Sequence, residues 1–243
     1  MNVDVAFVPP IVAPVDRTCI VIDVLRATSV IAVLMEKGMR RIYPTATVEE
    51  ARALRATLAS DGSEVLLLGE TGGLPPEGFD AGNSPTALEQ LAISAEVAVQ
   101  ATTNGTPALL ACEGAPLVMA AAPLNAAAVT RLALEAGHDV LIVCAGLRGG
   151  FAEDDTLAAG LFVERLVLAG AHASDAASEA LLRYEAARDH LADALRDTEH
   201  GRITVGLGFD ADIELCATAD RIDRVAILGS HDGRAALEPH GGG

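Results

Sequence analysis

Four groups of polar residues follow apolar segments of the chain, and their types suit the binding of a small anion. The groups lie at residues 23–29, 70–85, 102–106 and 144–155. Carboxylates bind divalent cations or move protons, Arg binds phosphate or carboxylate through paired hydrogen bonds, and helix N-termini attract anions. Because ligands of α/β proteins bind beyond the carboxyl ends of the strands, these groups are the first candidates for a site.

The first group combines a carboxylate with a guanidinium at the end of a strongly apolar run. Asp23 lies within that run, where an unpaired carboxylate would be costly. One interpretation is a structural ion pair between Asp23 and Arg26. The other makes Asp23 a metal ligand and Arg26 an anion clamp, with Thr28 and Ser29 opening a helix whose N-terminus binds a phosphate.

The second group is a long loop rich in Gly, Pro, Asp and Asn. It contains Glu70 and Asp80, either of which could activate water or protonate a leaving group. Asn83 and Ser84 could bind substrate, and either could also cap a helix that begins at Pro85. A loop of this length inside a compact domain is more often functional than not, so we expect it to bind a ligand.

The third group offers neutral hydrogen-bond donors at the end of a strand. Thr102, Thr103, Asn104 and Thr106, together with Gly105, are expected to bind phosphate or carboxylate oxygens. The structural alternative is an ordinary Asn-Gly turn in which Thr106 caps the next helix.

The fourth group ends in three consecutive carboxylates. Glu153, Asp154 and Asp155 stand at the expected start of a helix, where acidic residues also complement the helix dipole. Three adjacent carboxylates repel one another unless they share a cation, and such hard oxygen donors suit Mg²⁺. Arg148, in the same group, provides a second guanidinium. The six histidines are scattered and form no pair with zinc-like spacing.

The apolar segments before these groups predict the elements that position them. Strands are expected at residues 3–8, 18–24, 41–44, 64–70, 97–103, 139–145 and 224–228. Helices are expected at residues 28–37, 123–137 and 154–169. One further helix is expected to begin at Thr47, and more helices are expected between residues 175 and 219. Strands that alternate with helices indicate the α/β class, with a largely parallel or mixed sheet flanked by helices. Residues 231–243 are expected to form a flexible tail.

The chain is expected to fold as a single compact unit over residues 1–230. Residues 19–27 and 141–149 resemble each other, because each segment is a strand followed by Leu-Arg. This similarity favours an additional hypothesis, in which two similar α/β halves, residues 1–122 and 123–230, are related by internal duplication.

The composition excludes several classes of partner. The 243 residues carry 17 Lys and Arg against 34 Asp and Glu, a formal net charge of −17, which disfavours nucleic-acid binding through a basic surface. We expect no membrane segment and no export signal, and therefore a cytoplasmic protein with reduced, mostly buried cysteines. A homodimer is expected from the frequency of that state among oligomers.

Taken together, the polar groups resemble the 2-phosphosulfolactate phosphatase family. The similar stretches are residues 21–28, 69–73, 78–85, 102–106 and 153–155 with Ala159 and Gly160, in the family's order. The resemblance extends from about residue 3 to residue 228. It implies a Mg²⁺-dependent phosphatase that releases phosphate from 2-phosphosulfolactate, on the route to coenzyme M, or from another phosphorylated 2-hydroxy acid.

The implied substrate is multiply anionic, whereas Lys37 is the single lysine of the chain. Arg and a metal ion must therefore supply the positive charge of the site. In the mechanism that we expect, Arg26 and Arg148 clamp the anionic groups of the substrate. The expected ligands of Mg²⁺ are Asp23, Glu153, Asp154 and Asp155.

The remaining roles concern the proton and the nucleophile. Glu70 or Asp80 is expected to deprotonate the attacking water or to protonate the leaving alkoxide. The nucleophile is left open between Asp23, Cys144 and a metal-bound water, with water preferred. The alternative function is a non-enzymatic binder of a small anionic metabolite.

Overall fold

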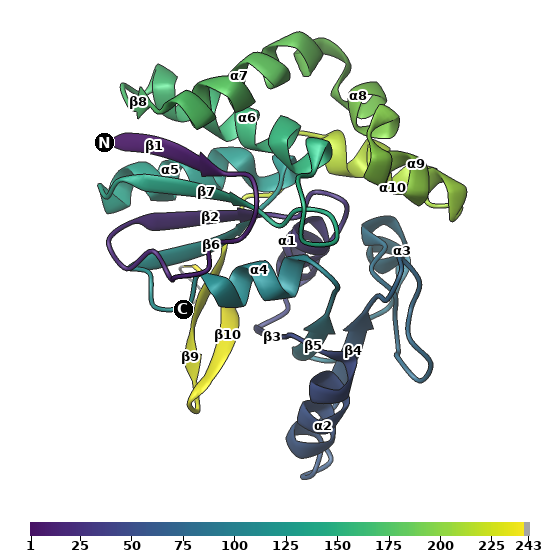
Figure 1. The fold of residues 1–243 in the computed structure, drawn as a ribbon. Helices are drawn as coiled ribbons and strands as arrows, with labels where there is room; N and C mark the ends of the chain where they lie inside the picture. The colour runs from purple at the N-terminus through teal and green to yellow at the C-terminus, as the bar shows by residue number, and fades with distance from the viewer. Residues whose placement is uncertain (241–243) are drawn as a thin grey trace.

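The computed structural model describes residues 1–240 and contains one mixed sheet with helices on both faces (Figure 1). Its ten strands are ordered β4-β5-β3-β10-β9-β6-β2-β7-β1-β8. The strands are β1 (Asn2–Ala6), β2 (Thr18–Ile22), β3 (Arg41–Thr45), β4 (Val65–Gly69), β5 (Val97–Ala101), β6 (Leu117–Ala121), β7 (Val140–Cys144), β8 (His172–Ala173), β9 (Ala226–His231) and β10 (Arg234–Pro239). The predicted class, α/β with a mixed sheet flanked by helices, is confirmed.

Two parallel blocks make up the sheet, and an antiparallel hairpin joins them. Strands β4, β5 and β3 form the smaller block, and β6, β2, β7, β1 and β8 form the larger one. In the hairpin, β10 pairs with β3 and β9 pairs with β6. Figure 1 shows the carboxyl ends of both blocks directed toward the same central region, where the loops that follow them meet.

The C-terminal hairpin corrects one prediction. The flexible tail expected at residues 231–243 is instead ordered into strand β10, and the preceding strand runs to His231 rather than ending at residue 228. The physical reason is burial, because Leu237 is fully buried and pairs with Ile42 of β3. Residues 241–243 of the predicted tail lie outside the described residues.

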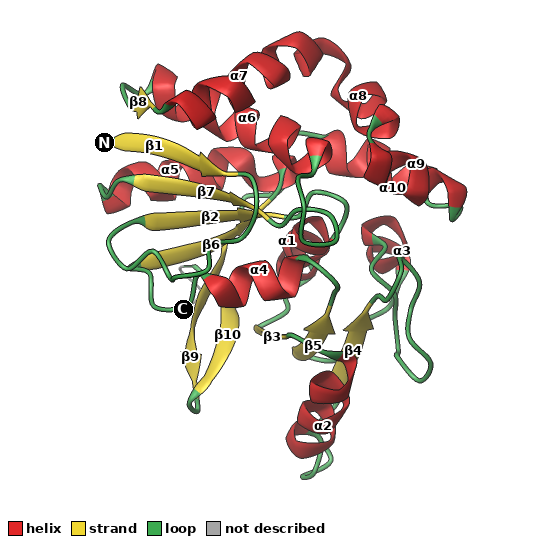
Figure 2. Cartoon of the chain, viewed as in Figure 1, coloured by secondary structure: helices red, strands yellow, loops and turns green. Residues whose placement is uncertain are grey.

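Helices cover both faces of the larger block (Figure 2). Ile20 and Ile22 of β2 pack with helices formed by residues 126–136, 153–168 and 175–187, whereas Cys19 and Val21 pack with helices formed by residues 27–36 and 105–111. Burial on both faces explains why the sequence of β2 is continuously apolar. The helices are α1 (Ala27–Glu36), α2 (Val48–Leu58), α3 (Pro85–Gln90), α4 (Gly105–Ala111), α5 (Ala126–Ala136), α6 (Glu153–Leu168), α7 (Asp175–Ala187), α8 (Leu191–Asp197), α9 (Glu199–Gly206) and α10 (Asp210–Ala217), with short 3₁₀ turns at Pro123–Asn125 and Arg188–His190.

Local sequence signals explain several helix ends. The Thr47 side chain accepts a hydrogen bond from the Glu50 N–H at 3.1 Å, which is the cap that the sequence predicts for α2. Ser84 caps α3, and Pro85 occupies its first turn, where a missing N–H costs nothing. Within residues 1–240, none of the helices combines the length and the apolar character that crossing a bilayer requires.

Strands β6 and β8 are not among the predicted elements. The alanines of β6 (Leu117–Ala121) favour a helix, but the segment lies between β2 and β9, and its burial there outweighs this preference. The two similar segments of the sequence fall on β2 and β7, which are adjacent parallel strands with Cys19 paired to Leu141. Internal duplication stays a hypothesis.

Candidate active site

A cavity of about 120 Å³ lies where the carboxyl ends of the two blocks meet. The loops after β2, β4, β5 and β7 line it, and α9 supplies a further wall. The predicted site residues that line the cavity are Asp23, Arg26, Glu70, Asn83, Thr103, Asn104 and Arg148. Its aliphatic side chains are Leu25, Leu147, Ile203 and Leu207. The rule that ligands bind beyond the carboxyl ends of strands therefore locates the cavity.

Asp23 is a buried carboxyl group at the floor of the cavity. It follows β2 directly, is 5% exposed, and accepts a hydrogen bond from the Ala27 N–H at 3.1 Å at the start of α1. Burial raises the pKa of Asp23 to about 6, although the nearby charge of His200 opposes the shift. The carboxyl group is thus poised to gain or lose a proton near neutral pH.

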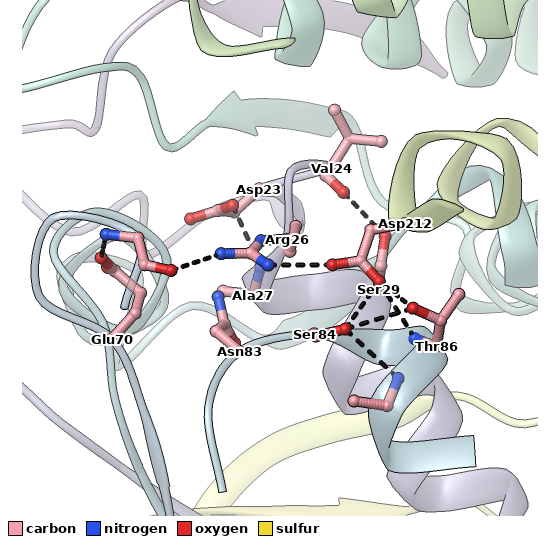
Figure 3. A network of polar contacts seen from close by, with 12 residues as sticks. Asp23, Val24, Arg26, Ala27, Ser29, Glu70, Asn83, Ser84, Thr86 and Asp212 are labelled. Atoms are coloured by element: carbon pink, nitrogen blue, oxygen red, sulfur yellow. Dashed lines mark hydrogen bonds and ion pairs between the residues drawn. The ribbon is translucent and has the colours of Figure 1, made fainter. Parts of the chain in front are cut away.

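Arg26 is held in a fixed orientation beside Asp23. Its Nη1 donates to Asp212 Oδ2 at 2.9 Å, and its Nη2 donates to the Gly73 carbonyl oxygen at 2.8 Å. The guanidinium also lies over the Phe209 ring, 4.2 Å from the ring centroid. Figure 3 shows Arg26 between the Glu70 loop and Asp212. The buried guanidinium of Arg26 therefore forms its ion pair with Asp212 and not with Asp23.

Asp212, the main support of Arg26, is not among the site residues predicted from the sequence. This residue is fully buried and accepts hydrogen bonds from Ser84 Oγ at 2.7 Å and from the Thr86 N–H at 3.2 Å, as well as from the Thr86 hydroxyl. A signal was present in the sequence, because Asp212 and the buried Cys216 are four residues apart on one face of α10. An acidic residue on the apolar face of a helix needs a cationic partner.

Glu70 joins the two loops of the smaller block at the cavity wall. Its Oε1 accepts the Thr103 N–H and its Oε2 accepts the Gly73 N–H, both at 2.7 Å. The Gly73 carbonyl oxygen also accepts a hydrogen bond from the Arg26 guanidinium. Glu70 therefore holds in place the loop that binds this guanidinium. These contacts favour a structural role over the predicted proton transfer, which stays a prediction.

Asp80 lies away from the cavity. Its Oδ2 accepts the Leu67 N–H at 2.8 Å, and its Oδ1 lies 3.3 Å from the Arg55 guanidinium of α2. The carboxylate ties the long loop to the edge of β4 and is absent from the cavity lining. The predicted catalytic role of Asp80 is therefore not supported, because both of its carboxylate oxygens are bonded to other groups of the protein.

Arg148 stands at the mouth of the cavity. Its side chain is 72% exposed, and its nearest acidic partner is Glu199, at 3.9 Å. Its backbone has a left-handed φ of 53° and donates to Asn104 Oδ1 at 3.2 Å. A weakly paired, exposed guanidinium can meet an incoming anion before the anion is desolvated.

The three consecutive carboxylates at the start of α6 point to three different partners. Glu153 forms an ion pair with Arg183 at 2.7 Å. Asp155 is buried and accepts the N–H groups of Val24 at 2.9 Å and Gly146 at 3.0 Å, which ties the ends of β2 and β7 together. Burial, with the nearby acids, raises the pKa of Asp155 well above its usual range. Only Asp154 of the three contacts a cavity residue, as described next.

His200 of α9 lines the cavity, although it is not among the site residues predicted from the sequence. Its Nδ1 lies 3.0 Å from Asp154 Oδ2, and its side chain is 19% exposed. Burial opposes protonation of the ring, but the hydrogen bond and the charge of Asp154, with the charge of Asp23, outweigh it and raise the pKa of His200. His200 is therefore a candidate proton donor at the cavity wall.

The metal ligands predicted from the sequence do not form one cluster. Within residues 1–240, no group of three or more His, Cys, Asp or Glu side chains is arranged to hold a metal ion. Two carboxylates remain available, Asp23 at the cavity and Asp154, whose buried Oδ1 has no hydrogen-bond partner. Mg²⁺ commonly uses one or two protein carboxylates and takes further ligands from water and substrate phosphate. Asp23 and Asp154 thus offer the type of donor that Mg²⁺ prefers, whereas Glu153 and Asp155 are bonded to other groups of the protein.

Most of the predicted hydroxyl ligands stabilise turns. Thr28 donates to the Asp23 carbonyl oxygen and Ser29 to the Val24 carbonyl oxygen, each at 2.9 Å. The Thr106 N–H donates to Thr102 Oγ1 at 3.0 Å, and Thr106 lies inside α4, so the hydroxyl at the start of this helix is that of Thr102 and not, as the structural alternative expected, that of Thr106. The binding roles predicted for these residues and for Ser84 are not supported, because their hydroxyls are bonded within the protein.

Cys144 is unsuited to act as a nucleophile. It is fully buried at the end of β7, and burial raises the pKa of its thiol well above the usual range. The other cysteines, Cys19, Cys112 and Cys216, are also free and buried, as predicted.

Gly105 allows the close approach of α4 to Asp23. A Cβ here would lie 2.6 Å from Asp23 Oδ2 and would also collide with the Ala27 Cβ. We expect Gly105→Ala to displace the Asp23 carboxyl group and to lower the free energy of unfolding by roughly 1–3 kcal/mol. Urea unfolding measures this loss. Gly206→Ala, where a Cβ would meet nothing within 4 Å, is the matched control and should not destabilise the protein. Equal stability of the two variants would contradict the packing.

Comparison with known proteins identifies similar chains over nearly the whole length. A family model described as 2-phosphosulpholactate phosphatase matches residues 10–231. The chain is similar to a "Probable 2-phosphosulfolactate phosphatase" of Thermotoga petrophila, with 37% identity over 93% of this chain and 95% of the relative. Proteins of the same name from Deinococcus radiodurans and Carboxydothermus hydrogenoformans are 40% and 32% identical, covering 82% and 98% of this chain and of each relative.

Proposed function

The chain belongs to the 2-phosphosulfolactate phosphatase family, and from this membership we propose that it is a Mg²⁺-dependent phosphatase of 2-phosphosulfolactate or a related phosphorylated 2-hydroxy acid. The observation that carries the proposal is the cavity in which the buried Asp23 carboxyl group and the fixed Arg26 guanidinium lie together. A carboxylate can hold a metal ion and a guanidinium can bind a phosphoryl group, so the pair suits phosphoryl transfer.

The charges around the cavity support the proposed need for a cation. Arg26 and Arg148 are offset by Asp23 and Glu70, and Asp154 adds a further buried carboxylate behind His200. A phosphate ester that also carries a carboxylate or a sulfonate would be repelled by these acids. Asp23 and Asp154 would hold Mg²⁺, which would polarise a phosphoryl oxygen and offset charge in the transition state.

The positions of three side chains suggest their roles in binding the anion, orienting it and donating a proton. Arg148, exposed at the mouth, would capture the anion, and Arg26, fixed by Asp212, would orient the phosphoryl group. His200, whose pKa is raised, would donate a proton to the leaving alkoxide. Water is the proposed nucleophile.

A phosphate-release screen tests the proposed function. Purified protein is incubated with 2-phosphosulfolactate, 2-phospholactate and other phosphorylated 2-hydroxy acids, with Mg²⁺ or with a chelator. We expect phosphate release that requires Mg²⁺ and that is faster for acids with a second anionic group. Ligand-dependent thermal stabilisation without any phosphate release would instead support the alternative, a non-enzymatic binder of a small anionic metabolite.

The pKa of Asp23 predicts how the effect of Mg²⁺ on stability depends on pH. Because burial raises that pKa to about 6, the carboxyl group is mostly neutral at about pH 5 and mostly ionised at about pH 7.5. Only the ionised form binds a cation well. We therefore expect Mg²⁺ to raise the melting temperature more at about pH 7.5 than at about pH 5.

In the metal-free protein, Asp23 makes the stability of the fold decrease, rather than increase, as the pH rises. The folded protein then holds the Asp23 proton more tightly than the unfolded chain does, so this contribution to stability is present at low pH and is lost as the pH rises through about 6. Asp23→Asn is the control and should remove the pH-dependent part of the Mg²⁺ effect. An identical Mg²⁺ effect at both pH values would remove Asp23 from the proposed metal site.

A further inference from the structure

Gln100 is a fully buried polar residue in β5, a strand whose other residues are Val and Ala. Its Nε2 donates to the Ala27 carbonyl oxygen at 3.4 Å and to Asn83 Oδ1 at 3.2 Å. Its Oε1 is buried without a hydrogen-bond partner. An unsatisfied buried amide oxygen costs stability, so the contribution of Gln100 to the fold does not explain the residue.

These contacts determine which way the two side-chain amides face. The Ala27 carbonyl can only accept a hydrogen bond, so the amide nitrogen of Gln100, and not its oxygen, must face it. That nitrogen also faces Asn83, and Asn83 must therefore present its oxygen to Gln100. The amide nitrogen of Asn83 is consequently directed away from Gln100.

Asn83 lines the cavity, although it is only 4% exposed. Within residues 1–240, its amide nitrogen has no hydrogen-bond acceptor at bonding distance, whereas its oxygen is used by Gln100. Figure 3 shows Asn83 below Arg26, on the side of the guanidinium that faces the Glu70 loop. The site thus contains an N–H donor pair, on a nearly buried residue, next to a guanidinium whose Nη atoms already have partners, Asp212 and Gly73.

We propose that Gln100 is a positioning residue that fixes the amide of Asn83 with both N–H groups directed into the cavity, where they bind an anionic oxygen of the substrate. The proposal rests on the proposed function, because it assigns these donors to the phosphoryl or carboxylate oxygens of a phosphorylated hydroxy acid. A neutral donor binds such an oxygen without adding a further charge. If the Asn83 amide rotated, its carbonyl oxygen would face the anion and repel it.

A double-mutant cycle tests the coupling between the two residues. Gln100→Met keeps the length of the side chain but removes the donor, and Asn83→Ala removes the amide. The probe is inorganic phosphate in the presence of Mg²⁺, and its Kd is measured by calorimetry. We expect each single variant to weaken phosphate binding about tenfold, and the double variant to bind no more weakly than Asn83→Ala. Gln90→Met, on the exposed end of α3, is the matched control and should bind as the wild type does.

Two results would overturn the proposal. Phosphate affinity that is unchanged in Gln100→Met would show that the residue does not act on the ligand. An effect of Gln100→Met that persists in full in the Asn83→Ala background would show that it acts by another route. A positioning role further predicts that Gln100→Met raises KM more than it lowers kcat, while a general loss of structure would lower the melting temperature and kcat together.

A measurement on the wild type keeps the test independent of how the variants fold. In ¹⁵N-labelled protein, the side-chain amide signals of Asn83, assigned by their absence in Asn83→Ala, should shift when phosphate is added. Unshifted signals at saturating phosphate would contradict the proposal. Failure of the proposed function is a separate result, since it would appear as no phosphate release by the wild type even if the binding cycle shows full coupling.

Discussion

Asp23→Asn should lower the rate of phosphate release by about 10²–10⁴-fold while the protein stays folded. The amide has nearly the same shape and can keep the hydrogen bond from the Ala27 N–H, so the start of α1 is preserved. It cannot carry the negative charge that the carboxylate offers to a metal ion. Since burial raises the pKa of Asp23, replacing the carboxyl group with a neutral one should also leave the metal-free protein as stable or more stable near pH 7.

Steady-state kinetics with saturating Mg²⁺, together with thermal unfolding, measure both parts of this prediction. Asp80→Asn is an informative control, because Asp80 also follows a strand but contacts Arg55 and the Leu67 N–H outside the cavity. Its turnover should stay close to that of the wild type. Wild-type turnover in Asp23→Asn would rule out the proposed site, and a large loss in Asp80→Asn would return Asp80 to it.

Asp212→Ala should lower the free energy of unfolding by about 3–5 kcal/mol and abolish turnover. The substitution leaves the Arg26 guanidinium buried without its ion-pair partner, and it also removes the acceptor of the Ser84 and Thr86 hydroxyls. A buried charge without a partner is more costly than the loss of a single hydrogen bond. Because Arg26 would then reorient toward solvent, the phosphoryl group would lose its fixed donor.

Chemical denaturation of Asp212→Ala, of Asp210→Ala and of the double variant Arg26→Met/Asp212→Leu separates stability from function. Asp210 lies on the same helix, but it is exposed and pairs with Arg196 at the surface, so its loss should have little effect. The double variant replaces the whole ion pair with apolar side chains and should regain most of the stability but no turnover. A stable and active Asp212→Ala would contradict the role assigned to the pair.

The sequence predicts the part of the site that follows from topology. Asp23 and Arg148 come shortly after two strands of the larger block, and Glu70 and Thr103 come shortly after two strands of the smaller block. Parallel strands bring such positions to one edge of each block. The strand ends are visible in the sequence because buried strands are continuously apolar. The sequence does not show that the edges of the two blocks meet at one cavity, because this depends on the antiparallel hairpin that joins them.

The predicted carboxylates that lie outside the cavity differ from Asp23 in their partners rather than in their type. Asp80, Glu153 and Asp155 are carboxylates suited to catalysis, yet they bind backbone N–H groups or an Arg that the fold brings near them. His200 and Asp212 belong to two short helices of eight residues each, whose sequences do not show what their buried residues contact. Their roles depend on the packing of α9 and α10 over the cavity, which is a tertiary property.

The position of the C-terminal hairpin has a consequence for the order in which the protein can assemble during synthesis. Strands β9 and β10 are the last to leave the ribosome, yet they lie in the middle of the sheet and form its only link between β3 and β6 within the described chain. Each parallel block can begin to fold earlier, but the sheet between the two blocks is completed only after Pro239 has emerged. Because both blocks line the cavity, we expect a chain truncated before the hairpin to lack the proposed phosphate release.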